Sequence, residues 1–227
     1  CFCMEYRELV KYYEELEKTT KKLEKTDILS KLFKGSSSEE LGIVVSLAQG
    51  KVFPEWDERK IGFSSRLVLK AISSVTGTNQ ANVEKVWKSR GDLGLVVEEL
   101  IKSKRQTTLS SKSLSVERVY ENIRKLAELG GEGTVNKKVQ LVCELLSNAE
   151  PIEAKFIVRT ILEELRVGVK EGIIRDAISK AFECNAEDVE GVFNLIVDYG
   201  EVAKLAKSKS LKKVEIKVGR PTKLITT

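Results

Sequence analysis

A segment near the middle of the chain, residues 130–138, combines glycines, a hydroxyl, an amide and two cations in a spacing that suits an anion. The glycines let a backbone come close to a ligand. Thr134 is placed to open a helix, whose free N–H groups and dipole favour negative charge. Lys137 and Lys138 fall in the first helical turn, where cations are unfavourable unless something negative is near. The predicted phosphate-binding residues are Gly133, Thr134, Asn136, Lys137 and Lys138.

Two further segments place a cation two residues before a glycine, where a helix is expected to begin. A glycine there can let the backbone approach a sugar–phosphate edge closely. The two segments are 59–65 (RKIGFSS) and 165–170 (LRVGVK).

Basic residues interleaved with serine and threonine form two stretches, 102–108 and 207–213. Such stretches suit phosphate, because the cations neutralise its charge while the hydroxyls donate hydrogen bonds. Lys104 and Arg105 are the predicted contacts in the first stretch. The alternative interpretation of either stretch is a solvated surface.

Histidine is absent from the 227 residues, which excludes every mechanism that uses imidazole as a base, proton shuttle or metal ligand. Cys143 and Cys184 lie in apolar helical stretches and are expected to be small buried hydrophobes, so no metal site is predicted. The formal net charge is +5, and aromatic residues make up only 6%, which gives little support to a platform for stacking single strands. The composition therefore favours a binding module over an enzyme.

The elements that position these segments are predicted to be helices. Apolar residues recur at spacings of three and four along most of the chain, as in Val116, Val119, Ile123 and Leu126. Only 3 prolines interrupt the pattern. We therefore predict an all-α, multi-helix fold.

The helical pattern is repeated within the chain. A shift of 106 residues gives 11 identities without a gap between 62 and 96, where average composition predicts roughly two. These identities include Gly62 with Gly168, Asp92 with Asp198 and Gly94 with Gly200. Upstream, a shift of 113 aligns residues such as Glu40 with Glu153.

The repeat predicts two helical halves, about 4–105 and 106–213, packed about a pseudo-twofold axis. Such an axis presents two equivalent surfaces to one partner, and DNA, whose backbone has local twofold symmetry, is a natural match. Because the apolar helix faces are typical of core and few aromatic residues are present, we expect sequence-independent binding to the duplex backbone, with access from the minor groove.

Several motifs carry a family resemblance. They are 158–169 (VRTILEELRVGV), 61–72, 91–94 (GDLG), 4–10 (MEYRELV) and 218–221 (VGRP). In combination they resemble the N-terminal DNA-binding domain of ATP-dependent DNA ligases, most closely the archaeal type. The resemblance implies an all-helical domain that grips nicked double-stranded DNA across the minor groove, in DNA replication, repair and recombination. Carried over by motif, it implies that the groove and backbone are contacted by Arg166, Gly168, Val169 and Lys170, and in the first half by Lys60, Gly62 and Ser64. It also implies that phosphates are held by Thr134, Asn136, Lys137 and Lys138.

The resemblance also defines what this chain should lack and what it could bind. Ligase chemistry needs a lysine in a Lys-x-Asp-Gly motif to form the AMP adduct, and no such motif occurs in the sequence. We therefore expect no catalytic residue, cofactor or metal in this chain; ATP and Mg²⁺ are implied for the full-length parent. Archaeal relatives use a loop near Gln106 to bind the sliding clamp, which makes Gln106 and Leu109 candidates for that contact.

The predicted extents follow from the same motifs. Residues 4–213 form the DNA-binding domain, 214–227 a linker toward an absent adenylylation domain, and 1–3 an expression remnant. No apolar run approaches the ~20 residues of a membrane span. We expect a monomer in the cytoplasm, associated with the nucleoid, or in the nucleus if the source is eukaryotic.

Two alternatives remain open at this point. A helical protein-interaction scaffold would not bind DNA and would expose an apolar patch. An unrecognised enzyme would need carboxylate pairs or Ser/Lys dyads. Glu163 with Glu164 and Ser64 with Ser65 are candidates for such a role, but they are more simply interpreted as solvated helix faces.

Overall fold

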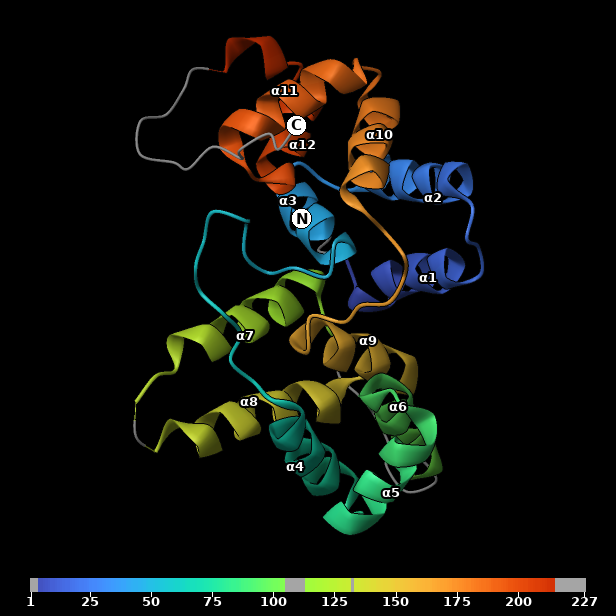
Figure 1. Ribbon diagram of the computed structural model, residues 1–227, viewed down its shortest axis with the longest axis vertical. Coiled ribbons are helices and arrows are strands. Elements are labelled where there is room, and N and C mark those ends of the chain that lie inside the picture. The colour runs from blue at the N-terminus through green and yellow to red at the C-terminus, as the bar shows by residue number, and fades with distance from the viewer. Residues whose placement is uncertain (1–3, 105–112, 132, 215–227) are drawn as a thin grey trace. The chain divides into compact units, whose positions relative to one another are not determined.

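The computed structural model describes residues 4–104, 113–131 and 133–214 (Figure 1). Within these ranges all regular elements are helices and no strand occurs, which confirms the predicted all-α class. The predicted linker beyond 214 and the first three residues lie outside the described part of the chain. The elements are α1 (Tyr6–Glu17), α2 (Lys22–Gly35), α3 (Leu41–Ala48), α4 (Ser65–Thr76), α5 (Gln80–Arg90), α6 (Leu93–Lys104), α7 (Val116–Glu128), α8 (Thr134–Asn148), α9 (Pro151–Ile161), α10 (Glu171–Phe182), α11 (Ala186–Ile196), α12 (Tyr199–Lys207) and the short 3-10 helix η2 (Leu211–Lys213).

The helix bounds follow the register of the sequence repeat. A shift of 106 superimposes the bounds of α4 on those of α10, and those of α5 on those of α11. The shift of 113 relates α2 to α8 within one residue at the start. Helices α3 and α9 end at equivalent positions under the same shift. Each predicted half therefore contains the same series of helices.

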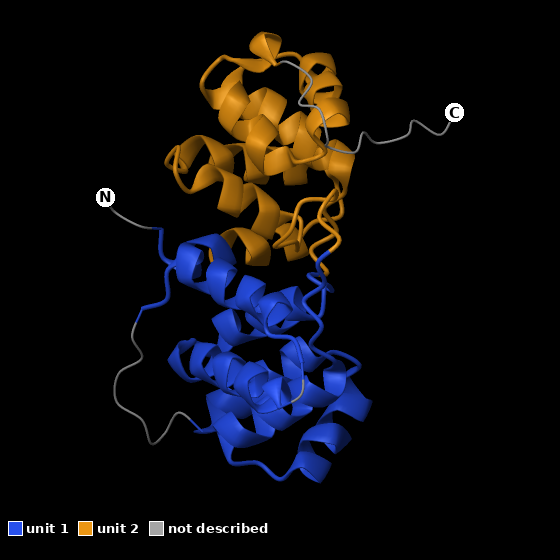
Figure 2. Cartoon of the chain, turned by 90° about the vertical axis from the view of Figure 1, so that its left-hand side faces the viewer, with its two compact units in different colours: residues 1, 3–10, 59–165 blue, residues 2, 11–58, 166–227 orange. Residues whose placement is uncertain are grey.

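The compact units do not coincide with the two predicted halves (Figure 2). Unit 1 comprises 3–10 and 59–165, and unit 2 comprises 11–58 and 166–227, of which the structure describes the residues to 214. In unit 1, α4 packs against α8 and α6 against α9. In unit 2, the equivalent helices α10 and α12 pack against α2 and α3. Each unit thus combines the later helices of one half with the earlier helices of the other, which sequence similarity between the halves could not reveal.

A glycine in each unit allows two helices to cross with their backbones in contact. A Cβ added to Gly94 of α6 would lie 2.8 Å from the carbonyl oxygen of Lys155 in α9. A Cβ added to Gly200 of α12 would lie 2.7 Å from the carbonyl oxygen of Gly42 in α3. These distances leave no room for a side chain, so the two glycines that match in the repeat mark equivalent crossings.

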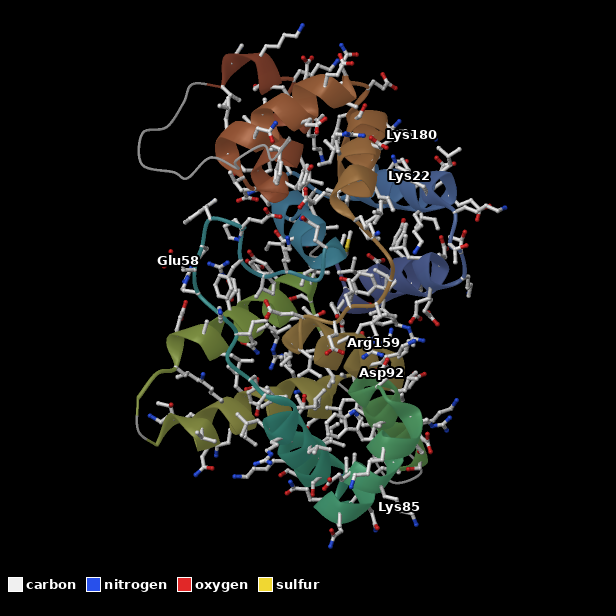
Figure 3. The ribbon with its side chains drawn as sticks, viewed as in Figure 1. Lys22, Glu58, Lys85, Asp92, Arg159 and Lys180 are labelled. Carbon is white, nitrogen blue, oxygen red and sulfur yellow. The ribbon has the colours of Figure 1, made fainter. Side chains whose placement is uncertain are left out.

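An aspartate two residues before each of these glycines caps the crossing helix. Oδ1 of Asp92 accepts from the backbone N–H of Gly94 at 2.8 Å, and Oδ1 of Asp198 accepts from that of Gly200 at 2.9 Å. In unit 1 the capping carboxylate also forms an ion pair: the Arg159 guanidinium donates twice to Asp92 Oδ2, at 2.8 and 3.1 Å (Figure 3). Both side chains of this ion pair are 7% exposed. The Asp-x-Gly motif shared by the halves is therefore a packing device.

Apolar side chains from every helix pair fill the interior of the units. In unit 1 they include Ile72, Val96 and Val142, which are fully buried. In unit 2 they include Phe33, Val45 and Ile178, which are also fully buried. Among the described helices, none has the length and apolar character that a membrane crossing requires.

Replacing either crossing glycine by alanine should destabilise the fold. In Gly94→Ala and in Gly200→Ala the new methyl group meets a backbone carbonyl, so the helices must separate, at a cost of about 1–3 kcal/mol in the free energy of unfolding. Gly191→Ala is the matched control, because Gly191 lies inside α11 with nothing within 4 Å of its Cβ position. That control should stabilise by about 0.5–1 kcal/mol. Urea denaturation measures all three, and similar effects for the three variants would contradict the crossing.

The two capping aspartates should differ in how much they stabilise the chain. Asp198→Ala removes a helix cap, which costs about 0.5–2 kcal/mol. Asp92→Ala removes the cap and also breaks the buried ion pair with Arg159, and breaking a buried pair costs about 3–5 kcal/mol. Thermal and urea unfolding of the two variants test the difference. Equal losses would show that Arg159 does not depend on Asp92.

Candidate nucleic-acid interface

The first glycine loop, residues 60–64 of unit 1, alternates between inward and outward side chains. Ile61 and Phe63 are 2% and 5% exposed and anchor the loop in the core. Lys60, Gly62 and Ser64 are exposed. All three predicted contact residues therefore form one outward row immediately before α4.

The second glycine loop, residues 166–170 of unit 2, repeats this arrangement immediately before α10. Val167 is 3% exposed and anchors the loop, while Val169 is half-buried. Arg166, Gly168 and Lys170 are exposed. Under the shift of 106, this outward row matches that of the first loop position by position, with a cation, a glycine and a polar or charged residue.

The backbone explains why glycine occupies the centre of both rows. Gly62 has φ +61° and Gly168 has φ +65°, a left-handed conformation that residues other than glycine rarely adopt. Arg166 adopts φ +59° in the second loop despite its side chain. A residue other than glycine held in this region stores backbone strain of order 1–3 kcal/mol, a feature that clusters at functional sites.

In unit 1 the fold brings the first glycine loop together with the start of α8. Nζ of Lys138 lies 3.4 Å from the carbonyl oxygen of Gly62. A second contact joins the same helices, since Nζ of Lys70 on α4 donates to Oδ1 of Asn136 on α8 at 3.2 Å. The two segments predicted separately from the sequence, 60–64 and 133–138, therefore share one surface.

The helix starts at this surface have no side-chain caps. Helix α8 begins at Thr134 as predicted, after Gly133 with φ +80°, but the Thr134 hydroxyl donates to the Gly131 carbonyl instead of capping the helix. At α4 the N-cap is Ser64, whose side chain makes no capping hydrogen bond. The other helices that lie wholly in unit 1 are capped, α5 by Asn79, α6 by Asp92, α7 by Ser115 and α9 by a capping box of Glu150 with Glu153. Both uncapped starts of unit 1 therefore offer free N–H groups at the candidate interface.

Several cations around these helix starts are not engaged in the structure. Within the described residues, Lys60 and Lys137 form no ion pair or hydrogen bond, and the same is true of Lys170 in unit 2. Arg66, exposed in the first turn of α4, joins them and was not singled out from the sequence. Unneutralised cations in a first helical turn are unfavourable alone, so they favour an anionic ligand.

In unit 2 a hollow lies at the start of α10, beside the second glycine loop. Its volume is about 410 Å³. Lys51 and Lys170 contribute cations to its lining, and Glu171 contributes a carboxylate. Lys51 is paired with Glu55 at 2.8 Å. Lys22 and Lys180 form ion pairs across α2 and α10 with Asp176 and Asp27 (Figure 3). The hollow is lined by Gln49, Lys51, Val169, Lys170, Glu171 and Gly172.

Two described lysines of the basic stretches, Lys104 and Lys207, bind elsewhere in their units. Lys104 donates to the carbonyl of Val75, at the opposite end of α4 from Gly62. Lys207 donates to the carbonyl of Ser36 at 2.5 Å. Both lysines lie in the last turns of their helices, where cations complement the helix dipole. Arg105, Gln106 and Leu109 lie outside the described residues.

The remaining groups that could take part in chemistry are the two described cysteines and the acidic side chains. Cys143 and Cys184 are free and half-buried, more exposed than the sequence predicted, and burial raises the pKa of both thiols. In the described part of the chain, no group of three or more His, Cys, Asp or Glu residues is arranged to hold a metal ion.

The sequence reasoning missed one residue beside the second loop. Lys25 of α2 is buried and donates to the Val167 carbonyl. Extending the 113-residue shift by a few positions would have found it, since it pairs Lys25 with Lys138.

Known proteins resemble the chain over almost its entire length. A DNA ligase of Methanothermobacter thermautotrophicus is 44% identical over 221 residues, one of Thermococcus fumicolans 43% over 223, and one of Nanoarchaeum equitans (strain Kin4-M) 38% over 225. These alignments cover 96%, 97% and 98% of this chain, but 40% of each relative. The chain therefore spans about two fifths of the length of these ligases.

The family described as "DNA ligase N terminus" matches residues 5–179. The match includes the first glycine loop, the start of α8 and the second glycine loop, which are the surfaces built above. Because the match covers most of the chain and the relatives align along nearly all of it, the chain belongs to the DNA ligase N-terminus family.

Proposed function

We propose that the chain binds nicked double-stranded DNA through backbone and minor-groove contacts, without reading base sequence, as the DNA-binding part of an ATP-dependent DNA ligase. The observation that carries the proposal is the duplicated outward row of cation, glycine and polar residue, which each unit presents at the start of a helix. The ligase relatives support it, since DNA is the substrate named for them.

The groups on these surfaces suit phosphate and sugar better than base edges. Lys60, Arg166 and Lys170 supply charge, and the N–H groups of α4 and α8 supply neutral donors. Glycine at the centre of each row lets the DNA backbone approach the protein closely. A surface built this way gains affinity from each phosphate without distinguishing one sequence from another.

The chemistry of strand joining belongs, in this proposal, to the part of the relatives that the chain does not match. The sequence contains no Lys-x-Asp-Gly motif, so ATP and Mg²⁺ would act there. The domain would hold the nicked duplex for that chemistry in replication, repair and recombination, in the compartment that contains the chromosome. Gln106 and Leu109 stay candidates for contact with a sliding clamp.

The alternative function, a protein-interaction scaffold, has little support in the structure. Among the described residues, Leu23 of unit 2 and Val135 of unit 1 are the exposed large hydrophobic side chains. One such side chain in each unit does not make the contiguous apolar patch that a protein-binding face requires. The described surface of each unit therefore favours a charged partner.

Titration onto nicked, intact and single-stranded DNA at several salt concentrations tests the proposal. With ~4–6 phosphate contacts, the slope of log affinity against log salt should be about −3.5 to −5.5 on duplex DNA. Nicked duplex should bind most tightly and single strands most weakly. Binding that is indifferent to salt, or absent from all three DNAs, would refute the proposal.

Removing the lysines that form no ion pair or hydrogen bond within the described residues should make the salt slope shallower by the same amount for each lysine. Lys137→Ala in unit 1 and Lys170→Ala in unit 2 should each make the slope shallower by about 0.9, and the double variant by about 1.8, because each lysine neutralises one phosphate. Lys85→Ala is the control, since Lys85 is an exposed lysine on α5, outside both surfaces (Figure 3). Its slope should match that of the parent protein. Slopes unchanged in both single variants would place the DNA elsewhere.

A further inference from the structure

Lys25 is a buried lysine whose partner is a backbone carbonyl rather than a carboxylate. It lies in α2 and is 6% exposed. Its Nζ donates to the carbonyl of Val167, and among the described residues no carboxylate pairs with it. Lysine is almost never buried without a charged partner, because removing the ammonium from water is costly. Burial accordingly lowers the pKa of Lys25. A group kept at such a cost needs an explanation beyond packing.

The ammonium of Lys25 and the second glycine loop fit together closely. A Cβ added to Gly168 would lie 2.5 Å from Lys25 Nζ, so a side chain at that position would displace the ammonium. The Val167 carbonyl is drawn inward by the same group, while the residues on either side of Val167, Arg166 and Gly168, are exposed. Lys25 therefore holds the loop from its buried side, with Val167 facing inward and Arg166 and Gly168 facing outward.

Unit 1 contains a similar contact between the equivalent lysine and the equivalent loop, although the accepting carbonyl lies one residue further along the loop. Nζ of Lys138 lies 3.4 Å from the carbonyl of Gly62, and a Cβ on Gly62 would lie 3.5 Å from that Nζ. Lys138 is related to Lys25 by the shift of 113, and Gly62 to Gly168 by the shift of 106.

The groups around the two contacts have diverged, although the contacts themselves persist. Lys22 pairs with Asp176 in unit 2, whereas Val135 and Lys70 occupy those positions in unit 1. Persistence of the lysine–loop contact amid such changes indicates that the contact itself serves the repeated surface.

We propose that Lys25 is a positioning residue for DNA binding: from beneath the second glycine loop it holds the Val167 carbonyl inward and so orients Arg166, Gly168 and Lys170 toward the phosphates. Lys138 has the equivalent role at the first loop. The inference rests on the proposed function for its purpose, but the lysine–loop contact is a property of the protein alone. Its test therefore has one arm without DNA and one with it.

The arm without DNA measures amide hydrogen exchange by mass spectrometry across 166–174, where the N–H groups of Ile173 and Ile174 donate to the Lys170 carbonyl at the end of the loop. Lys25→Met keeps the aliphatic stem and removes Nζ, so these amides should exchange at least about tenfold faster, as local opening becomes easier. Lys31→Met is the matched control, because Lys31 is an exposed lysine on the same helix with no partner among the described residues. It should leave exchange in the loop unchanged. Unchanged exchange in Lys25→Met would overturn the proposal.

The arm with DNA is a double-mutant cycle on nicked duplex. Lys25→Met alone should weaken binding roughly tenfold, the scale of one charge-assisted hydrogen bond. In a Lys170→Ala background the loss should shrink to about threefold or less, because both changes act through one loop. In a Lys60→Ala background, which alters the loop of the other unit, the full loss should persist. Equal losses in both backgrounds would show that Lys25 does not act through its loop.

Two features keep the outcomes distinct. If the parent protein fails to bind DNA, the proposed function fails, yet faster exchange in Lys25→Met would still establish the lysine–loop contact. If Lys25→Met does not fold, Lys138→Met takes its place, since Lys138 is only half-buried. Exchange is then measured across 60–68, where the N–H groups of Leu67 and Val68 donate to the Ser64 carbonyl. Faster exchange there supports the repeated positioning role, and unchanged exchange overturns it.

Discussion

The structure depends on two places where helices cross with nothing between their backbones. Gly94 of α6 meets the carbonyl of Lys155, and Gly200 of α12 meets the carbonyl of Gly42. At each crossing an aspartate two residues earlier satisfies the free N–H groups of the helix start, which would otherwise be stranded close to the core. Close contact fixes the separation of the helices, and the cap fixes where the crossing helix begins. The same short motif therefore sets the internal geometry of both units.

With those crossings fixed, a second helix pair in each unit positions a glycine loop. Helix α4 lies against α8, and α10 against α2, so each loop that precedes α4 or α10 runs beside the first turns of a partner helix. Apolar side chains at alternate positions, Ile61 in one loop and Val167 in the other, hold these loops down. In each loop, the residues on either side of this buried side chain face outward. Burial of these apolar side chains therefore directs the charged residues of each loop toward solvent.

The division of roles among charged residues follows burial and partners. Arg159 lies in the motif that carries the family resemblance, yet its guanidinium forms a buried ion pair with Asp92 inside unit 1. Lys104 and Lys207 bind carbonyls at helix ends. The cations left for a ligand are those at helix starts, such as Lys137 and Lys170, where no side chain neutralises them within the described structure. Net charge alone does not locate an interface; the partners of each cation do.

The sequence by itself determined the helical class and the internal repeat, because periodicity and spacing are local properties of the chain. It also predicted the exposed residues of both glycine loops, but it included Val169, which is half-buried. It could not determine which half supplies the partner of each helix, since similar halves offer similar apolar faces, and the units in fact exchange them. Nor could it separate the free cations from the engaged ones, or find Lys25, whose importance comes from a carbonyl 142 residues away. Only tertiary contacts bring such groups together, because burial and hydrogen-bond partners depend on the packing of distant segments.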